Sequence, residues 1–124
     1  YMYAKRNLEI ARNNIQIFLD CQREDGRFPG MITHDDETFF PGIVHIKNTS
    51  LNAVYGWLQG YCFPMPAFEL YFWLNKDQEY LQRLYYALEK FDNYLWKTRD
   101  SDNNGCLETW CVFDTGEDNA IRFG

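Results

Sequence analysis

The segment from residue 99 to residue 119, RDSDNNGCLETWCVFDTGEDN, concentrates the side chains that could do chemistry. It holds six carboxylates, three asparagines and one tryptophan in 21 positions. Carboxylates bind hard cations such as Ca²⁺, and a pair of them can act as general acid and general base in glycoside hydrolysis. The spacing of these residues indicates which half of the segment suits which chemistry.

The first half of the segment has the spacing of the start of a calcium-binding loop. Asp100, Asp102 and Asn104 occupy alternate positions, a glycine follows, and Glu108 lies at position nine. A cysteine stands at position twelve, where a bidentate glutamate is expected. These four residues are candidate ligands of a structural calcium ion. The alternative is an Asx-rich turn, in which the same side chains accept hydrogen bonds from their own backbone.

The second half of the segment contains a candidate proton donor, Asp118. Repulsion from the neighbouring carboxylates Glu117 and Asp114 would raise its pKa, and aromatic cover would desolvate it. The alternative is that Asp118 caps a helix, with Arg122 four residues on as its partner. Both interpretations stay open on the residues alone.

Three tryptophans and one arginine are the side chains considered for binding a sugar. Trp110, beside the acidic segment, is the best candidate for stacking on a sugar ring, and Trp57 is a second candidate. Trp73 lies in an apolar stretch and is expected to pack in the core. Arg27 could bind a hydroxyl or a carboxylate of the substrate.

Three helices are expected to position these residues. Apolar residues recur three and four apart from about Tyr3 to Gln22 and again from about Gln78 to Lys97, which predicts two amphipathic helices. Asp77 is a natural N-cap for the second of them. Between them, two prolines suit a first helical turn, so a helix is expected from about Met65 to Asn75. It is apolar nearly all round, which predicts an inner, buried helix.

The fold class expected from this pattern is all-α, with a long loop from Phe28 to Thr49 that could include a short strand pair. The two amphipathic helices match each other at a shift of 76 residues, which suits helical hairpins laid side by side. A ring of six hairpins needs twelve helices of roughly 11–12 residues each. Residues 1–124 are therefore expected to form a single partial domain, an arc of such a ring.

Composition excludes several classes of partner. The net charge is −6 and the pI is about 4.8, so no basic stripe is available to neutralise the phosphates of a nucleic acid. No apolar run reaches the roughly 18 residues of a membrane span, so no membrane partner is expected. The four cysteines have no zinc-ligand spacing and are expected to be free buried thiols, with disulfides as the alternative. The cellular compartment stays open.

Four stretches of the chain resemble, in the right order, motifs of the glycosidases that include trehalases, processing α-glucosidase I and mannosylglycerate hydrolases. WCVFDTGEDNAIRF, residues 110–123, is similar to the pattern W-x-x-[ED]-S-G-x-D-N/F-S-x-R-W. TRDSDNNGCLET, residues 98–109, is similar to the R-D-x-D/N-x-N-G-L-x-E run that precedes that pattern. DGRFPG and FPMPAFEL, at residues 25–30 and 63–70, are looser matches to two N-terminal motifs.

The resemblance implies a six-hairpin α/α toroid of the glycoside hydrolase family 63-like group, which hydrolyses an α-glycosidic bond with inversion. It implies that Asp118 is the general acid, that Gly116 and Asn119 belong to the substrate-binding segment, and that the base is a glutamate outside this chain. The expected partner is a carbohydrate substrate. No cofactor is required, and the rest of the barrel would come from the missing chain or another chain. Phe63 stands where the family has a substrate-binding glutamine, which leaves the sugar open.

Two other functions are considered. FLDCQREDGRFPG, residues 18–30, also resembles a repeat of terpene cyclases and protein prenyltransferase β subunits, which would imply an isoprenoid substrate in an α/α toroid. The chain lacks a second copy of that repeat and the D-x-D-D cluster of the cyclases. The third possibility is a non-catalytic, calcium-stabilised helical module that binds a carbohydrate or a partner protein.

Overall fold

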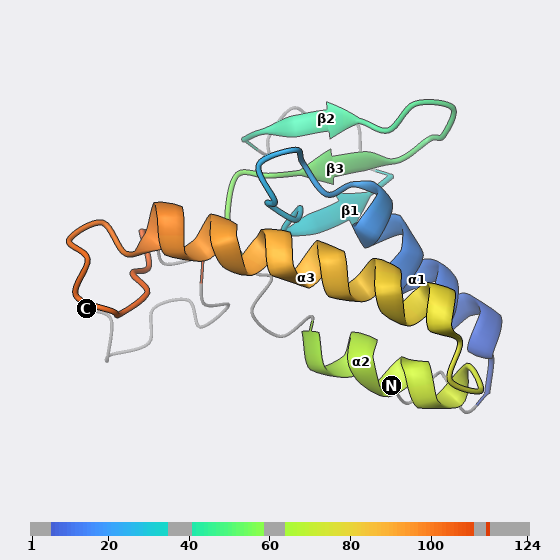
Figure 1. Ribbon diagram of the computed structural model, residues 1–124. Helices are drawn as coiled ribbons and strands as arrows, with labels where there is room; N and C mark the ends of the chain where they lie inside the picture. Colours follow the sequence, from blue (N-terminus) through green and yellow to red (C-terminus); the bar gives the residue numbers. More distant parts are fainter. Residues whose placement is uncertain (1–5, 35–40, 59–63, 111–113, 115–124) are drawn as a thin grey trace.

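The computed structural model describes residues 6–34, 41–58, 64–110 and 114. Within these ranges the chain forms three helices and three strands, with α3 between the sheet and α2 (Figure 1). The elements, in chain order, are α1 (Leu8–Asp20), β1 (Met31–Thr33), β2 (Ile43–His45), β3 (Asn52–Val54), α2 (Pro64–Trp73) and α3 (Gln78–Arg99). None of the helices in these ranges is long and apolar enough to cross a membrane.

The three predicted helices are confirmed, with ends set by local hydrogen bonds. The Asn7 side chain accepts a hydrogen bond from the Ile10 amide at 3.0 Å and so begins α1, while Asp77 does the same for the Tyr80 amide at 3.1 Å and begins α3. The helix expected at residues 65–75 runs instead from Pro64 to Trp73. It ends earlier because Asn75 and Lys76 take the left-handed backbone conformation, with φ of 53° and 59°.

The expectation of an all-α fold is confirmed only in part, because part of the predicted loop pairs as a three-stranded antiparallel sheet. The strand order is β1-β3-β2, and Ala53 of β3 lies opposite Ile32 on one side and Val44 on the other. All three residues of β3 are buried, so their backbone N–H and C=O groups need partners, and the two flanking strands provide them. That the helices form an arc of a toroid stays a prediction.

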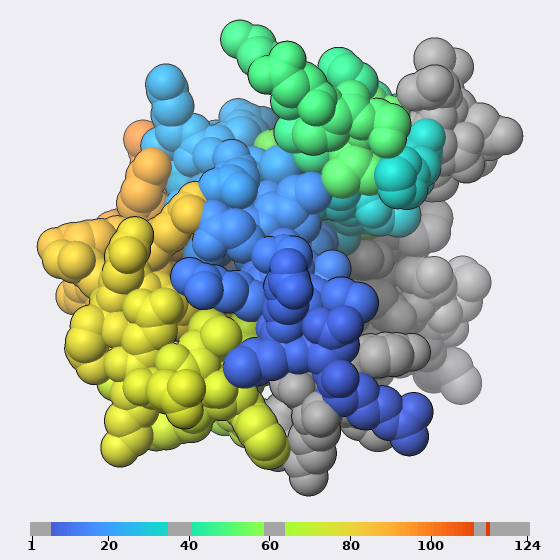
Figure 2. Space-filling model, turned by 90° about the vertical axis from the view of Figure 1, so that its right-hand side faces the viewer, coloured from blue at the N-terminus to red at the C-terminus, as the bar shows by residue number. Residues whose placement is uncertain are grey.

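The core lies where α1, α2 and the turn after α1 meet α3. Its main side chains are Leu19, Phe28, Leu58, Ala67, Leu70, Tyr80, Leu84, Ala87, Phe91, Tyr94 and Leu95. The Phe28 ring packs on Phe91 with centroids 5.1 Å apart. Gln22 links the turn to α3. Its side-chain amide donates hydrogen bonds to the carbonyl oxygens of Gly26, at 2.8 Å, and Ala87, at 2.7 Å. Figure 2 shows α1 packed beside the turn between α2 and α3, with the strands above them.

The α2 helix is only partly buried, so the expectation of a buried inner helix is wrong for the structure as described. Ala67 and Leu70 are buried against α3, whereas Met65 is 65% exposed and Phe72 is 54% exposed. Trp73, expected in the core, is 39% exposed. Apart from Glu69 the helix is apolar, and in the described ranges only Ala67 and Leu70 of it are buried.

Candidate functional site

The centre of the candidate site is a buried ion pair between Arg99 and Asp114. Arg99 is the last residue of α3, and its Nη1 lies 2.9 Å from Asp114 Oδ2, with side chains 5% and 2% exposed. Asp114 Oδ1 accepts a hydrogen bond from the Leu58 amide at 2.8 Å, and Oδ2 accepts another from the Trp110 amide at 3.0 Å. These hydrogen bonds compensate for the cost of removing the carboxylate from water. One side chain therefore joins the end of α3, the segment after β3 and the segment before residue 114.

Trp110 lies on the surface above this ion pair. The guanidinium carbon of Arg99 is 4.4 Å from the centroid of the indole, a distance that allows a cation–π contact. The indole Nε1 donates to Glu108 Oε2 at 3.3 Å. Trp110 is nevertheless 63% exposed, so one face of the ring rests on Arg99 while much of the rest is open to solvent. An aromatic ring held in this way can receive the C–H face of a sugar.

The loop after α3 is closed by Glu108. Its amide donates to the Arg99 carbonyl, and its carboxylate accepts a hydrogen bond from the Ser101 hydroxyl at 2.8 Å. The hydrogen bonds from Ser101 and then from Trp110 favour the ionised carboxylate and lower the pKa of Glu108 below its usual value. The charge on Glu108 thus helps to hold both the loop and the Trp110 ring.

The four predicted calcium ligands lie together in this loop, and each already accepts hydrogen bonds within it. Asp100 accepts from the amides of Asn104, at 2.9 Å, and Gly105, at 3.2 Å. Asp102 accepts from the Asn104 side chain at 2.8 Å, and Asn104 accepts from the Cys106 amide at 2.8 Å. Across the described ranges, no group of three or more His, Cys, Asp or Glu side chains could hold a metal ion. The geometry fits the Asx-rich turn, and calcium binding stays a prediction.

Arg27 and Trp57, two of the predicted sugar-binding residues, lie in loops beside the sheet. Trp57 is half-buried and directly precedes Leu58, so the hydrogen bond to Asp114 ties its backbone to the site. Arg27 follows a turn that packs on Lys90 of α3, nine residues before Arg99. At a helical rise of 1.5 Å per residue that separation is roughly 13 Å. The Trp57 segment is thus joined to the site. Arg27 lies in a loop that contacts α3 near Lys90, well before the end of α3 where Arg99 stands.

The remaining predicted site residues, Asp118, Gly116 and Asn119, lie outside the described residues. From the sequence, the negative charge of Asp114 was expected to raise the pKa of Asp118. The Arg99 guanidinium neutralises Asp114, so repulsion from that carboxylate is weaker than the sequence suggested. Sequence reasoning missed the ion pair itself. The only available signal was an arginine at the end of a predicted helix.

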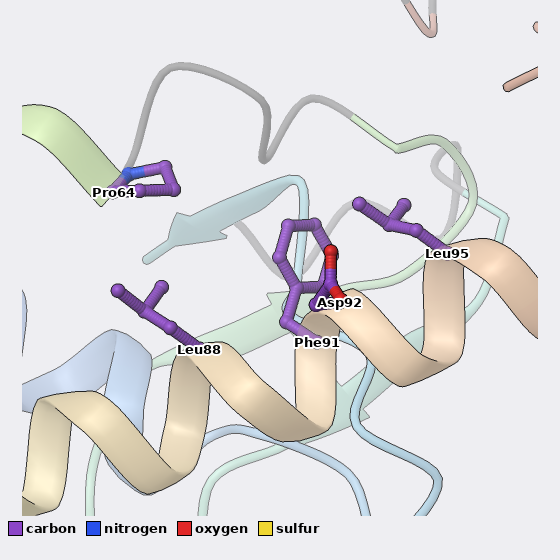
Figure 3. Close-up of a pocket in the computed structure, with 5 residues that line it drawn as sticks. All are labelled: Pro64, Leu88, Phe91, Asp92 and Leu95. Atoms are coloured by element: carbon purple, nitrogen blue, oxygen red, sulfur yellow. The ribbon is translucent and has the colours of Figure 1, made fainter. Parts of the chain in front are cut away.

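A separate cavity of about 240 Å³ lies between the start of α2 and α3. Figure 3 shows Leu88, Phe91 and Leu95 along one face of α3, with Pro64 of α2 opposite them. Asp92 supplies the one carboxylate among the described residues that line it. Among the residues that the structure describes, the lining is mostly apolar and includes neither Arg99 nor Asp114, so we treat this cavity separately from the ion pair.

Comparison with known protein families identifies the class as a glycoside hydrolase domain. Residues 2–124 match the family described as the mannosylglycerate hydrolase MGH1-like glycoside hydrolase domain, and the chain belongs to this family. The match confirms the resemblance of the motifs to the mannosylglycerate hydrolase group. No curated protein and no solved structure matches the chain significantly.

Of the four cysteines, the structure describes Cys21 and Cys106, and both are free thiols. Cys21 is buried, as expected, and burial raises the pKa of its thiol. Cys106 is exposed, so the expectation of burial is wrong for this residue. The other two cysteines, Cys62 and Cys111, lie outside the described residues.

Proposed function

We propose that this domain belongs to an enzyme that hydrolyses an α-glycosidic bond with inversion, using Asp118 as general acid. Family membership supports the glycosidase class. The observation that carries the proposal is the exposed Trp110 ring, held on the Arg99–Asp114 ion pair a few residues before Asp118 in the chain. Hydrolysis of a glycoside needs carboxyl groups beside the bond that is cleaved, and this exposed ring directly precedes a carboxylate-rich segment of the chain.

Asp114 is unsuited to be the proton donor, although it belongs to the same motif. A general acid must be protonated at the start of the reaction, and its proton must reach the leaving oxygen. Both Asp114 oxygens already accept hydrogen bonds, and Arg99 favours the ionised form. Asp118 is therefore the carboxyl group proposed for this role, with Glu117 as the neighbouring carboxylate to test against it.

Inversion also requires a general base on the opposite side of the sugar, with the two carboxyl groups roughly 6.5–9.5 Å apart. We propose that the base is a glutamate from outside this segment. In the mechanism, Asp118 gives its proton to the departing oxygen, while the base takes a proton from the water that attacks the anomeric carbon. The reaction needs no redox cofactor, because only protons and the glycosyl group move.

The proposed substrate-binding residues are Trp110, Trp57, Arg27, Gly116 and Asn119. Trp110 would stack on the sugar, and the guanidinium of Arg27 suits a carboxylate or hydroxyl of the group attached to it. The Arg27 Nε is buried and makes no hydrogen bond in the part of the chain that the structure describes. The family name makes α-mannosylglycerate, a mannoside with a carboxylate on its aglycone, the first substrate to test.

We further propose that the three helices form an arc of an (α/α)6 toroid, completed by hairpins from the same polypeptide or another chain. The support is the apolar surface that α2 and α3 leave exposed. It includes Met65, Phe68, Phe72, Trp73, Tyr85, Tyr86 and Trp96. So many exposed large apolar side chains on two helices suit contact with other parts of a protein.

The test is hydrolysis of a panel of α-glucosides and α-mannosides, with α-mannosylglycerate included, by the full-length protein. Asp118→Asn should lower kcat about 10²- to 10⁴-fold, because the amide cannot protonate the leaving oxygen. Glu117→Gln is the matched control and should retain most of the activity. Following the first-formed anomer of the product by NMR tests inversion. Full activity in Asp118→Asn would contradict the assignment of the acid.

A structural calcium ion in the Asp100–Glu108 loop is the remaining part of the proposal. A ligand that binds only the folded protein increases the free energy of unfolding by RT ln(1 + [L]/Kd) and so raises the melting temperature. Calcium at millimolar concentration should therefore stabilise the wild type, and stabilise Asp102→Ala, which lacks one ligand, much less. If both proteins melt at unchanged temperatures, the loop is held by its own hydrogen bonds alone.

A further inference from the structure

The orientation of the Trp110 ring depends on three separate contacts. Its amide donates to Asp114 Oδ2 at 3.0 Å, its Nε1 donates to Glu108 Oε2 at 3.3 Å, and its ring lies 4.4 Å from the Arg99 guanidinium carbon. Surface tryptophans usually turn about their side-chain bonds, and ordering one on binding costs free energy. These contacts restrict that motion before any ligand arrives.

Arg99 is the contact best placed to set the plane of the ring, because it is itself fixed. Its side chain is only 5% exposed, and its Nη1 is held by Asp114 at 2.9 Å. Asp114 is fixed in turn by the Leu58 amide at 2.8 Å. The other partner of the indole, Glu108, lies in an exposed loop. The guanidinium is therefore a rigid, planar support under a ring that is 63% exposed.

We infer that Arg99, held by Asp114, is a positioning residue that fixes the plane of Trp110 so that a sugar ring can stack on its outer face. This inference rests on the proposed function and adds a residue that does not touch the substrate itself. Support from well-packed neighbours is what keeps a binding surface preorganised. The expected consequence is a contribution of Arg99 to substrate binding that exists only while Trp110 is present.

Arg99→Lys is the variant that separates positioning from folding. Lysine keeps the positive charge near Asp114 but lacks the planar group that lies under the indole. KM for the α-mannoside or α-glucoside hydrolysed fastest in the panel should rise about two- to fivefold, the size expected for a lost cation–π contact. kcat should change less than about twofold. Arg83→Lys, the same exchange in the exposed ion pair with Asp20, is the control and should leave KM unchanged.

A double variant decides whether Arg99 acts through Trp110. In the Trp110→Ala background, Arg99→Lys should have no further effect on KM. An equal rise in KM in both backgrounds would overturn the inference, and so would an unchanged KM in Arg99→Lys alone. If the lysine variant melts below the assay temperature, Arg99→Met combined with Asp114→Asn removes both buried charges together, and the same KM comparison applies.

Time-resolved fluorescence anisotropy provides a readout that needs no substrate. The contribution of Trp110, obtained by subtracting the signal of Trp110→Ala, should show added subnanosecond motion in Arg99→Lys and none in Arg83→Lys. If the protein hydrolyses none of the panel, the proposed function fails while this measurement still decides about positioning. Unchanged motion of the indole in Arg99→Lys would overturn the inference.

Discussion

Asp114 Oδ2 lies 2.9 Å from Arg99 Nη1, and both side chains are almost completely buried. A buried charge that loses its partner is costly, because neither water nor an opposite charge remains to stabilise it. We therefore expect Asp114→Ala to lower the free energy of unfolding by about 3–5 kcal/mol. Urea unfolding followed by circular dichroism measures this change.

The exposed pair between Asp20 and Arg83 is the control for this prediction, since its side chains are 54% and 45% exposed. Asp20→Ala should cost about 1 kcal/mol or less, because water and salt already screen the charges. Similar losses in both variants would show that burial does not set the strength of the Arg99–Asp114 pair.

Gly26 allows the turn after α1 to pack directly on α3. Its φ is +98°, and a Cβ placed on it would lie 2.1 Å from the Lys90 carbonyl oxygen. Gly26→Ala must therefore both strain the backbone and push the turn away from the helix. We expect a loss of about 2–4 kcal/mol in the free energy of unfolding.

Gly105 separates the two causes, because its φ is +81° but no atom lies within 4 Å of its added Cβ. Gly105→Ala should show the backbone strain alone, about 1–2 kcal/mol. Thermal melts of the two variants measure the difference, and an equal effect would mean that contact with Lys90 is unimportant.

Burial raises the pKa of Tyr80 to about 12, only partly opposed by the charge of Arg12. The folded protein then holds this proton more tightly than the unfolded chain, whose tyrosines titrate near pH 10. The stabilisation is complete below about pH 10 and is lost as the pH rises toward about 12. Two pKa units correspond to a fall of about 2–3 kcal/mol in the free energy of unfolding.

Tyr80→Phe should remove most of this alkaline dependence, measured as urea unfolding between pH 8 and pH 12. At neutral pH the variant should lose about 1 kcal/mol, because the hydroxyl donates to the Ala67 carbonyl at 2.7 Å. Tyr85→Phe changes an exposed ring and is the control. An alkaline slope that survives in Tyr80→Phe would contradict the prediction.

The pKa of Glu108 is lowered by its hydrogen bonds from Ser101 and Trp110. Its contribution to the loop is therefore present above the carboxyl's ordinary pKa and is lost as the pH falls through the lowered value. The Trp110 fluorescence should change over this acidic range in the wild type. Glu108→Gln should abolish the change, because the amide does not titrate, whereas a persistent transition would assign it to another group.

The helices could be predicted from the sequence because the interactions that form them are local. Asp77 caps α3 through a residue three positions away, and the spacing of apolar residues marks the buried faces. The left-handed turn at Gly26 follows from the same local reasoning, since glycine lacks a Cβ. The resemblance of four stretches to known motifs also indicated the glycosidase family, which the match over residues 2–124 confirms.

Only the tertiary structure decided which distant segments meet. Residues 31–33 pair with residues 52–54, and the Asp114 carboxylate binds an amide 56 positions away at Leu58. Neither contact leaves a periodic pattern in the sequence that could predict it, because each depends on how the intervening chain folds back. The role of Asp114 changed most as a result. By sequence it was a nearby charge acting on Asp118, and in the folded chain it is the partner that fixes Arg99 beneath Trp110.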